Sequence, residues 1–196
     1  MERLEPCKFV KFIHMRILGI DPGLQATGYG VIETGTAGVR VIEAGVVRPT
    51  GTDLAERIAS LYDGLSEVIA AFQPESMAVE QLYAHYDHPR TAILMGHARG
   101  VVLLAAAKNG LPVASFAATR IKKTITGHGR ASKTQMQHAI QRELKLVKTP
   151  EPPDVADALA VALTHHYAQK SPIVRRQLSV SKKLRTTNNG QRTTDD

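Results

Sequence analysis

The chain has 196 residues, of which 43% are hydrophobic, and a formal net charge of +7. This length allows one well-buried domain with tails. The single cysteine, Cys7, excludes an internal disulfide framework and suits a reducing cytoplasm. No run approaches the ~20 apolar residues of a membrane span. Residues 1–14 also lack the apolar core of a signal peptide. We therefore expect a cytoplasmic protein without membrane contact.

The positive charge is concentrated in the middle of the chain. Residues 88–142 hold 9 Lys or Arg and no acid, whereas residues 1–87 hold 7 basic and 12 acidic residues. Residues 170–196 are basic again, with 7 Lys or Arg against 2 acids. An acid-free stretch of this length favours a polyanionic partner such as nucleic acid. The alternative is that these basic side chains only solvate helix faces.

The first predicted element is a strand that ends in a carboxylate. Residues 17–20 form an apolar run with β-branched side chains, the Pro22-Gly23 dipeptide then forces a turn, and residues 27–32 alternate back into a second strand. Asp21 lies at the end of the first strand. A buried carboxylate is costly unless it is paired or bound to a metal. Asp21 therefore either caps the turn or faces an open site.

The next elements predict a sheet of mixed direction. A third strand over residues 38–47 would complete an antiparallel meander. Thr52 or Asp53 can cap a helix that runs to about residue 72. Residues 76–80 then form a strand that ends in Glu80, and a strand after a helix suggests a parallel partner for the first strand. Because ligands gather beyond strand ends where strand order switches, Asp21 and Glu80 are expected to converge.

The basic segment predicts a long helix, one more strand and two shorter helices. Residues 90–110 are rich in alanine and valine, and Gly96 and Gly100 there permit close approach of another backbone, in ordinary helix packing or at a dimer surface. A strand over 111–116 and a helix over 117–126 follow. Ser132 can cap a helix over 133–144.

The last predicted helix carries a second pair of acids. It begins near Glu151-Pro-Pro-Asp154, since proline suits a first turn. Asp154 and Asp157 are three residues apart and share a face. A first-turn acid interacts favourably with the helix dipole, which accounts for Asp154 without a site. Asp157 lies further in, beside strongly apolar residues, and is less well explained this way.

These four carboxylates would repel one another in one cleft, and some would stay protonated. Divalent cations remove that conflict, and oxygen ligands suit Mg²⁺ or Mn²⁺. Two such ions about 4 Å apart can activate a water and stabilise the leaving oxygen in phosphodiester cleavage. The basic residues expected to position a nucleic acid through its phosphates are Arg120, Lys122, Lys123, Arg130 and Lys133.

Four motifs together closely resemble RuvC, the bacterial Holliday junction resolvase family. They are residues 19–23 with 27–30, residues 79–83, residues 98–100 and residues 154–160, and the resemblance covers roughly residues 15–169. It implies an α/β, RNase H-like fold with a five-stranded mixed sheet flanked by helices. It also implies a homodimer that cuts two symmetric strands of a four-way junction with Mg²⁺, and a branch-migration partner, the RuvA–RuvB complex.

The resemblance also implies roles for individual residues. Asp21, Glu80, Asp154 and Asp157 would be the metal-binding catalytic acids, and Lys122 and Lys133 would contact the scissile or a nearby phosphate. Tyr83 stands where the family usually has a phenylalanine that stacks at the junction, and tyrosine keeps the ring face that stacking needs. Two positions vary: His97 replaces a common glutamine, and some members carry histidine in place of Asp154.

The chain is expected to divide into three segments: an extension, a domain and a tail. Met15 could be the true start, so residues 1–14 would be an extension outside the fold, followed by a nuclease domain over residues 15–169. Residues 170–196 lose periodicity and would form a disordered basic tail, which either adds non-specific DNA affinity or is merely solvated.

Three other functions compete with the resolvase. The Asp-Pro-Gly turn followed by Thr-Gly resembles the phosphate loop of actin-like sugar kinases and ATPases, but those proteins need two such domains around a nucleotide. A junction-binding module with structural acids would bind junctions without cutting them. A relative that cuts RNA or RNA–DNA hybrids would share the fold and the metal site.

Overall fold

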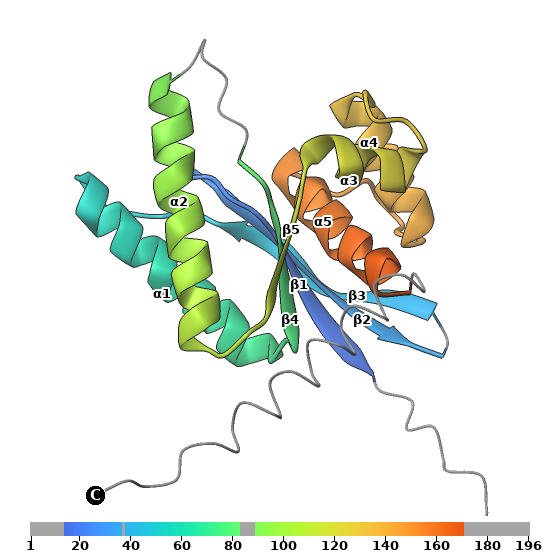
Figure 1. Cartoon of the computed structure of the whole chain (residues 1–196), viewed down its shortest axis with the longest axis horizontal. Coiled ribbons are helices and arrows are strands. Elements are labelled where there is room, and N and C mark those ends of the chain that lie inside the picture. Colours follow the sequence, from blue (N-terminus) through green and yellow to red (C-terminus); the bar gives the residue numbers. More distant parts are fainter. Residues whose placement is uncertain (1–13, 37, 83–88, 171–196) are drawn as a thin grey trace, which may run out of the picture.

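A computed structural model describes residues 14–36, 38–82 and 89–170 of the chain. Its centre is a five-stranded sheet in the order β3-β2-β1-β4-β5 (Figure 1). Strand β1 pairs with β2 antiparallel and with β4 parallel, β2 pairs with β3 antiparallel, and β4 pairs with β5 parallel. The elements are β1 (Met15–Asp21), β2 (Thr27–Gly35), β3 (Gly38–Val47), α1 (Leu54–Phe72), β4 (Ser76–Glu80), α2 (Pro89–Lys108), β5 (Val113–Phe116), α3 (Ala118–Thr126), α4 (Lys133–Glu143) and α5 (Pro153–Lys170).

Local sequence signals account for three of the helix boundaries. The Asp53 side chain accepts a hydrogen bond from the Glu56 backbone N–H at 2.8 Å and caps α1. Ser132 caps α4, and Gln135 reaches back to complete a capping box. Helix α2 ends two residues before the predicted position, because Gly110 adopts a left-handed φ of 65° and its N–H donates to the Ala107 carbonyl.

Helices cover both faces of the sheet (Figure 1). Helices α1 and α2 lie on one face and α3, α4 and α5 on the other. Strand residues alternate between the two cores: Leu18 and Ile20 pack towards α1 and α2, whereas Ile17 packs towards α5. This alternation is the period-two rule of an extended chain, here with both faces buried.

Three glycines let α5 lie directly on the backbone of β1 and β2. A Cβ at Gly19 would come within 2.8 Å of the Ala162 Cβ, and one at Gly30 within 2.7 Å of Leu159 Cδ2. A Cβ at Gly28 would overlap the Asp154 carbonyl oxygen. The first turn of α5 can therefore approach the strand ends only because these positions have no side chain.

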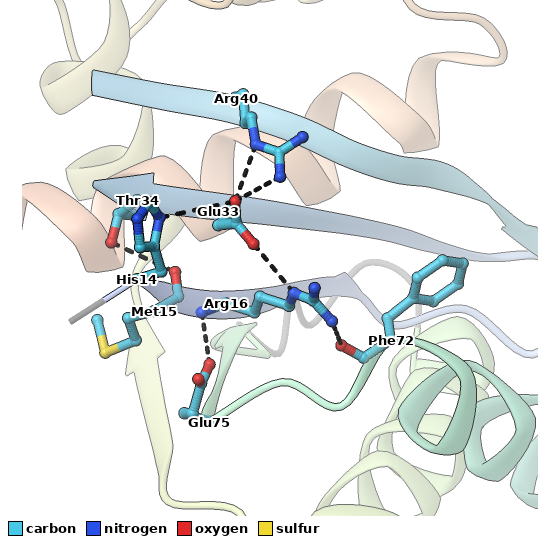
Figure 2. A network of polar contacts seen from close by, with 8 residues as sticks. All are labelled: His14, Met15, Arg16, Glu33, Thr34, Arg40, Phe72 and Glu75. Carbon is cyan, nitrogen blue, oxygen red and sulfur yellow. Dashed lines mark hydrogen bonds and ion pairs between the residues drawn. The ribbon is translucent and has the colours of Figure 1, made fainter. Parts of the chain in front are cut away.

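A network of charged side chains ties the strands together at the opposite end of β1 (Figure 2). Glu33 on β2 accepts hydrogen bonds from Arg40 Nε at 2.8 Å and from Arg16 Nε at 3.2 Å. Arg16 Nη1 also donates to the Phe72 carbonyl at 2.9 Å, which links the sheet to the end of α1. The hydrogen bonds from Arg40 and Arg16 hold the pKa of Glu33 below its usual range.

Candidate active site

Four carboxylates gather at one edge of the sheet. Asp21 is the last residue of β1 and Glu80 the last residue of β4, and these neighbouring strands run parallel. By the alternation along each strand, Asp21 shares a face with Ile17 and Gly19, and Glu80 shares one with Ala78. That is the face covered by α5, whose first turns carry Asp154 and Asp157.

The pKa values show how closely these acids interact. Burial, followed by the charges of Glu80, Asp157 and Asp154, raises the pKa of Asp21 to about 8. Burial, followed by the charge of Asp157, raises the pKa of Glu80. The pKa of Asp157 is also raised, chiefly by burial, with an added contribution from Asp154. The site thus holds several carboxylates whose ionised forms are disfavoured by desolvation and by one another.

Two lysines from the basic segment oppose this repulsion. The charge of Lys133, at the start of α4, lowers the pKa of Asp21 and of Asp157. The charge of Lys122, on α3, lowers the pKa of Glu80 and of Asp157. Neither lysine forms a salt bridge with these acids among the residues that the structure describes. Both therefore remain available to a phosphate group.

The residues of this edge fit a hard divalent cation. Their donors are all carboxylate oxygens, and none of the four carboxylates has an ion-pair partner within the described residues. Across residues 14–36, 38–82 and 89–170, no group of three or more His, Cys, Asp or Glu side chains is placed so that it could already hold a metal ion. An open arrangement agrees with Mg²⁺ chemistry, since that ion keeps several waters and uses substrate phosphate as a ligand.

The turn after β1 is stabilised by hydrogen bonds from side chains outside the acid cluster. Thr27 Oγ1 donates to the Gly23 carbonyl at 2.6 Å, and its oxygen accepts from the Gly23 N–H at 3.2 Å. From α1, Arg57 Nη2 donates to the Leu24 carbonyl at 2.7 Å. The turn is thus stabilised by Thr27 and Arg57, and the Asp21 side chain is left for the open site.

A hollow of about 460 Å³, part of it open to solvent, adjoins the acids. Asp21 and Glu80 both line it, which confirms that these two strand ends converge as the sequence predicted. Leu82 and Met95 supply apolar wall, and Arg99 of α2 supplies a guanidinium.

The structure separates the other predicted DNA contacts from the acids. Arg120 lies over the Phe116 ring with its guanidinium carbon 5.1 Å from the ring centroid, on the outer side of β5. Lys123 and Arg130 are exposed. None of these three side chains contributes to the shifted pKa values of the acids. Tyr83 lies outside the described residues.

Sequence reasoning placed residues 98–100 in a family motif but gave Arg99 no role. In the structure its guanidinium donates to the Glu80 backbone carbonyl and to Ser115 Oγ. A basic residue within an otherwise apolar helix was the available signal. The contact itself depends on how α2 crosses the sheet, which the linear sequence does not give.

The arrangement is suited to metal-assisted cleavage of a phosphodiester. The carboxylates can hold metal ions, the lysines can hold the substrate phosphates, and the hollow gives access from solvent. In the part of the chain that the structure describes, no cysteine or serine nucleophile lines this hollow.

Comparison with known proteins agrees with this chemistry. The family described as "Crossover junction endodeoxyribonuclease RuvC" matches residues 17–165. The relative of that description from Rhodopirellula baltica is 53% identical over 158 residues, covering 80% of this chain and 89% of its own. One from Delftia acidovorans is 46% identical over 157 residues, covering 79% and 85%.

Solved structures give the same result for the fold. Thermus thermophilus RuvC in complex with Holliday junction substrate has a TM-score of 0.72 and 36% identity, covering 80% of this chain and 96% of that one. The yeast mitochondrial Holliday junction resolvase Ydc2, at 14% identity and a TM-score of 0.53, covers 78% of this chain and 79% of its own and supports the fold alone. The RNase H-like fold is thus confirmed, and the chain belongs to the RuvC family of crossover junction endodeoxyribonucleases.

Proposed function

We propose that this protein resolves Holliday junctions by paired, symmetric, metal-dependent cleavage of DNA. The observation that carries the proposal is the convergence of Asp21, Glu80, Asp154 and Asp157 at one sheet edge, in a chain of the RuvC family. The raised pKa values of Asp21, Glu80 and Asp157 show that ionised carboxylates are disfavoured there, and a bound cation would relieve this.

In this proposal the four carboxylates hold Mg²⁺, with Mn²⁺ as a substitute and two ions in each site. When bound, the ions supply a water nucleophile of lowered pKa and stabilise the leaving oxygen. Lys122 and Lys133 hold the phosphates beside the acids. Lys123, Arg130 and Arg120 contact the DNA further out, and Tyr83 stacks at the junction.

The outer face of α2 supports a homodimer. Ile93 is 60% exposed, Leu94 43% and Leu104 50%, and a Cβ at Gly100 would meet no atom within 4 Å. Within the described residues, this helix alone is long and apolar enough to cross a membrane, and a single such helix is weak evidence for a span. A second copy of the chain covers this face in our proposal, and a two-fold pair of sites matches a two-fold substrate.

Family membership supports three further proposals. The protein works with the RuvA–RuvB branch-migration complex, and it does so in the cytoplasm. Residues 15–169 form the nuclease domain, residues 1–14 precede it, and residues 170–196 are a basic tail that is dispensable for cleavage.

The deciding experiment offers the purified protein a synthetic four-way junction, a linear duplex and an RNA–DNA hybrid, with and without Mg²⁺. We expect paired symmetric nicks on the junction alone, only with the metal. Asp21→Asn should abolish these nicks and leave junction binding largely intact, because the substitution removes one proposed metal ligand and no phosphate contact.

Each rival function predicts a different result. Tight junction binding without cleavage by any metal would favour the binding module. Cleavage of the hybrid alone would keep the metal site and change the substrate. Cleavage retained by Asp21→Asn would remove Asp21 from the proposed site.

A further inference from the structure

Arg99 joins α2 to the two strands beside the acids. Its Nε donates to the backbone carbonyl of Glu80 at 3.4 Å, and its Nη2 donates to Ser115 Oγ on β5 at 3.1 Å. The side chain is half-buried and lines the same hollow as Asp21 and Glu80. One guanidinium thus links a helix to the ends of β4 and β5 at the edge where the acids gather.

Arg99 reaches Glu80 from the face of the sheet opposite the carboxylate. Ala78 packs towards α5 and Val79 towards α2, so the alternation directs the Glu80 side chain towards α5. Ser115 pairs with Val79 and so points to the α2 side of the sheet, where it accepts a hydrogen bond from Arg99. Arg99 therefore contacts the main chain of Glu80, and its charge is not among those that shift the pKa of the Glu80 carboxylate.

The Glu80 carbonyl lies where strand pairing stops. Pairing between β1 and β4 ends at Ile20 and Val79, because the chain turns away after Asp21. On the other side the β4–β5 ladder continues, and the Gln81 N–H donates to the Phe116 carbonyl at 2.8 Å. On the β1 side the strand has no further backbone donor to offer, and Arg99 donates to the Glu80 carbonyl instead. An unsatisfied carbonyl in a partly buried site would cost free energy and leave the end of β4 less defined.

We propose that Arg99 is a positioning residue that fixes the main chain of Glu80 and so the direction of its carboxylate for metal binding. This inference rests on the proposed function, in which Glu80 is a metal ligand. Loss of a residue that orients a metal ligand typically costs about 10- to 100-fold in metal affinity or activity. Lysine is a poor substitute, since it lacks the planar fork that reaches two acceptors from one position.

The first test measures metal binding without DNA. Arg99→Met keeps the length and apolar stem of the side chain and removes its donors, and Lys108→Met is the control at the exposed far end of α2. We expect Mn²⁺ binding, followed by the electron paramagnetic resonance of free Mn²⁺, to weaken about 10-fold or more in Arg99→Met. The Mg²⁺ concentration for half-maximal cleavage should rise in parallel, while metal-free junction binding stays unchanged.

A second variant guards against a simple folding defect. Ser115→Ala removes one acceptor and leaves the Glu80 contact, so it should weaken Mn²⁺ binding less than Arg99→Met. The double variant should be no worse than Arg99→Met alone, because both changes act on one interaction. If Arg99→Met does not fold, Ser115→Ala and Arg99→Lys replace it, and both should weaken Mn²⁺ binding at an unchanged Tm.

Two results would overturn the inference. One is wild-type Mn²⁺ affinity in folded Arg99→Met, or in both replacement variants if it does not fold. The other is that Arg99→Met loses cleavage only at temperatures near its own lowered Tm and cleaves like the wild type at lower temperature. Glu80→Gln distinguishes failure of the Arg99 inference from failure of the proposed function. If Glu80→Gln also keeps full Mn²⁺ affinity, Glu80 is not a metal ligand and the proposed metal site is wrong. If only Glu80→Gln loses affinity, the site stands and Arg99 has no positioning role.

Discussion

Asp21 is the carboxyl group of the described residues whose pKa departs most from its ordinary value. Its pKa of about 8 means that the folded protein binds a proton there which the unfolded chain, with an ordinary carboxyl, releases over the range from about pH 4 to pH 8. The stability of the metal-free protein therefore falls as pH rises through this window. Ionisation of this buried carboxyl thus costs folding stability, and a bound cation would offset that cost.

Replacing Asp21 by asparagine should raise the Tm of the metal-free protein. The neutral amide avoids the penalty of a buried charge, so the gain should be larger near pH 8 than near about pH 5. We expect roughly 3 °C or more near pH 8, since about 1 kcal/mol moves the Tm of a domain this size by roughly 2–4 °C. Calorimetry with a chelator measures this, and exposed Asp63→Asn is the control. An unchanged Tm would contradict the inference that burial of the Asp21 carboxylate destabilises the metal-free protein.

Lys122 offers a test of the phosphate contacts. It is half-buried beside Glu80 and Asp157, and a DNA phosphate would replace water around its ammonium group. Lys122→Met should lower the slope of log Kd against log salt by about 0.9, the value for one lost contact with duplex DNA. Junction binding without metal provides the measurement, with Lys108→Met as the control. An unaltered slope would argue against a contact.

At the scale of elements, the contact of α5 with the sheet decides where two acids lie. Glycines at positions 19, 28 and 30 remove the side chains that would hold the helix away. Helix α5 then lies against β1 and β2, and its first turns reach the edge where β1 ends. The spacing of Asp154 and Asp157 gives them a common face, and the glycines bring that face to Asp21.

Gly28→Ala should therefore damage both stability and cleavage. The new Cβ would overlap the Asp154 carbonyl, which is backbone and cannot rotate aside, so the start of α5 must move. We expect a loss of about 1–3 kcal/mol in the free energy of unfolding, by denaturant titration, together with reduced cleavage. Gly129→Ala is the control, since its Cβ would lie 3.5 Å from the Thr119 carbonyl, an ordinary contact. Wild-type cleavage by a stable Gly28→Ala protein would show that α5 placement is not critical.

The two ends of the sheet have different electrostatic designs. At the end shown in Figure 2, Glu33 is paired with Arg16 and Arg40, which lowers its pKa and favours the charged form. At the other end, no arginine pairs with Asp21 or Glu80 among the described residues, and their pKa values rise. Carboxylates at one end thus stabilise the fold, while those at the other end are left for a ligand.

At the scale of the whole molecule, the described residues leave three large apolar side chains exposed on one helix, α2. A soluble domain rarely leaves large neighbouring hydrophobes such as Ile93 and Leu94 exposed unless they form an interface. Resolution of a junction by two symmetric cuts needs two sites, which a two-fold dimer through this face would supply.

Ile93→Asp should break the proposed dimer. A carboxylate buried without a partner in an apolar contact is costly. We therefore expect the dissociation constant of the dimer to rise by about 100-fold or more. Light scattering with size exclusion measures the mass, and Leu54→Asp, which replaces a 40% exposed leucine on α1, is the control. Paired nicks should become single nicks in the monomer. A stable dimer in Ile93→Asp would place the interface elsewhere.

The sequence by itself determined the elements and the identity of the candidate acids. Alternating apolar runs specify the strands, Asp53 and Ser132 mark helix starts, and Asp21 and Glu80 stand where strands end. These features are local, so short-range periodicity and capping reveal them. The membership of the chain in the RuvC family likewise follows from motifs read in linear order.

Only the tertiary structure decided which of these residues act on one another. The raised pKa of Asp21 depends on burial and on charges from β4 and α5, and the separation of Arg120 from the acids depends on its packing against Phe116. The bond from Arg99 to the Glu80 carbonyl likewise joins residues on separate elements. Each of these effects depends on distance in space between segments far apart in sequence, and no local pattern encodes that distance.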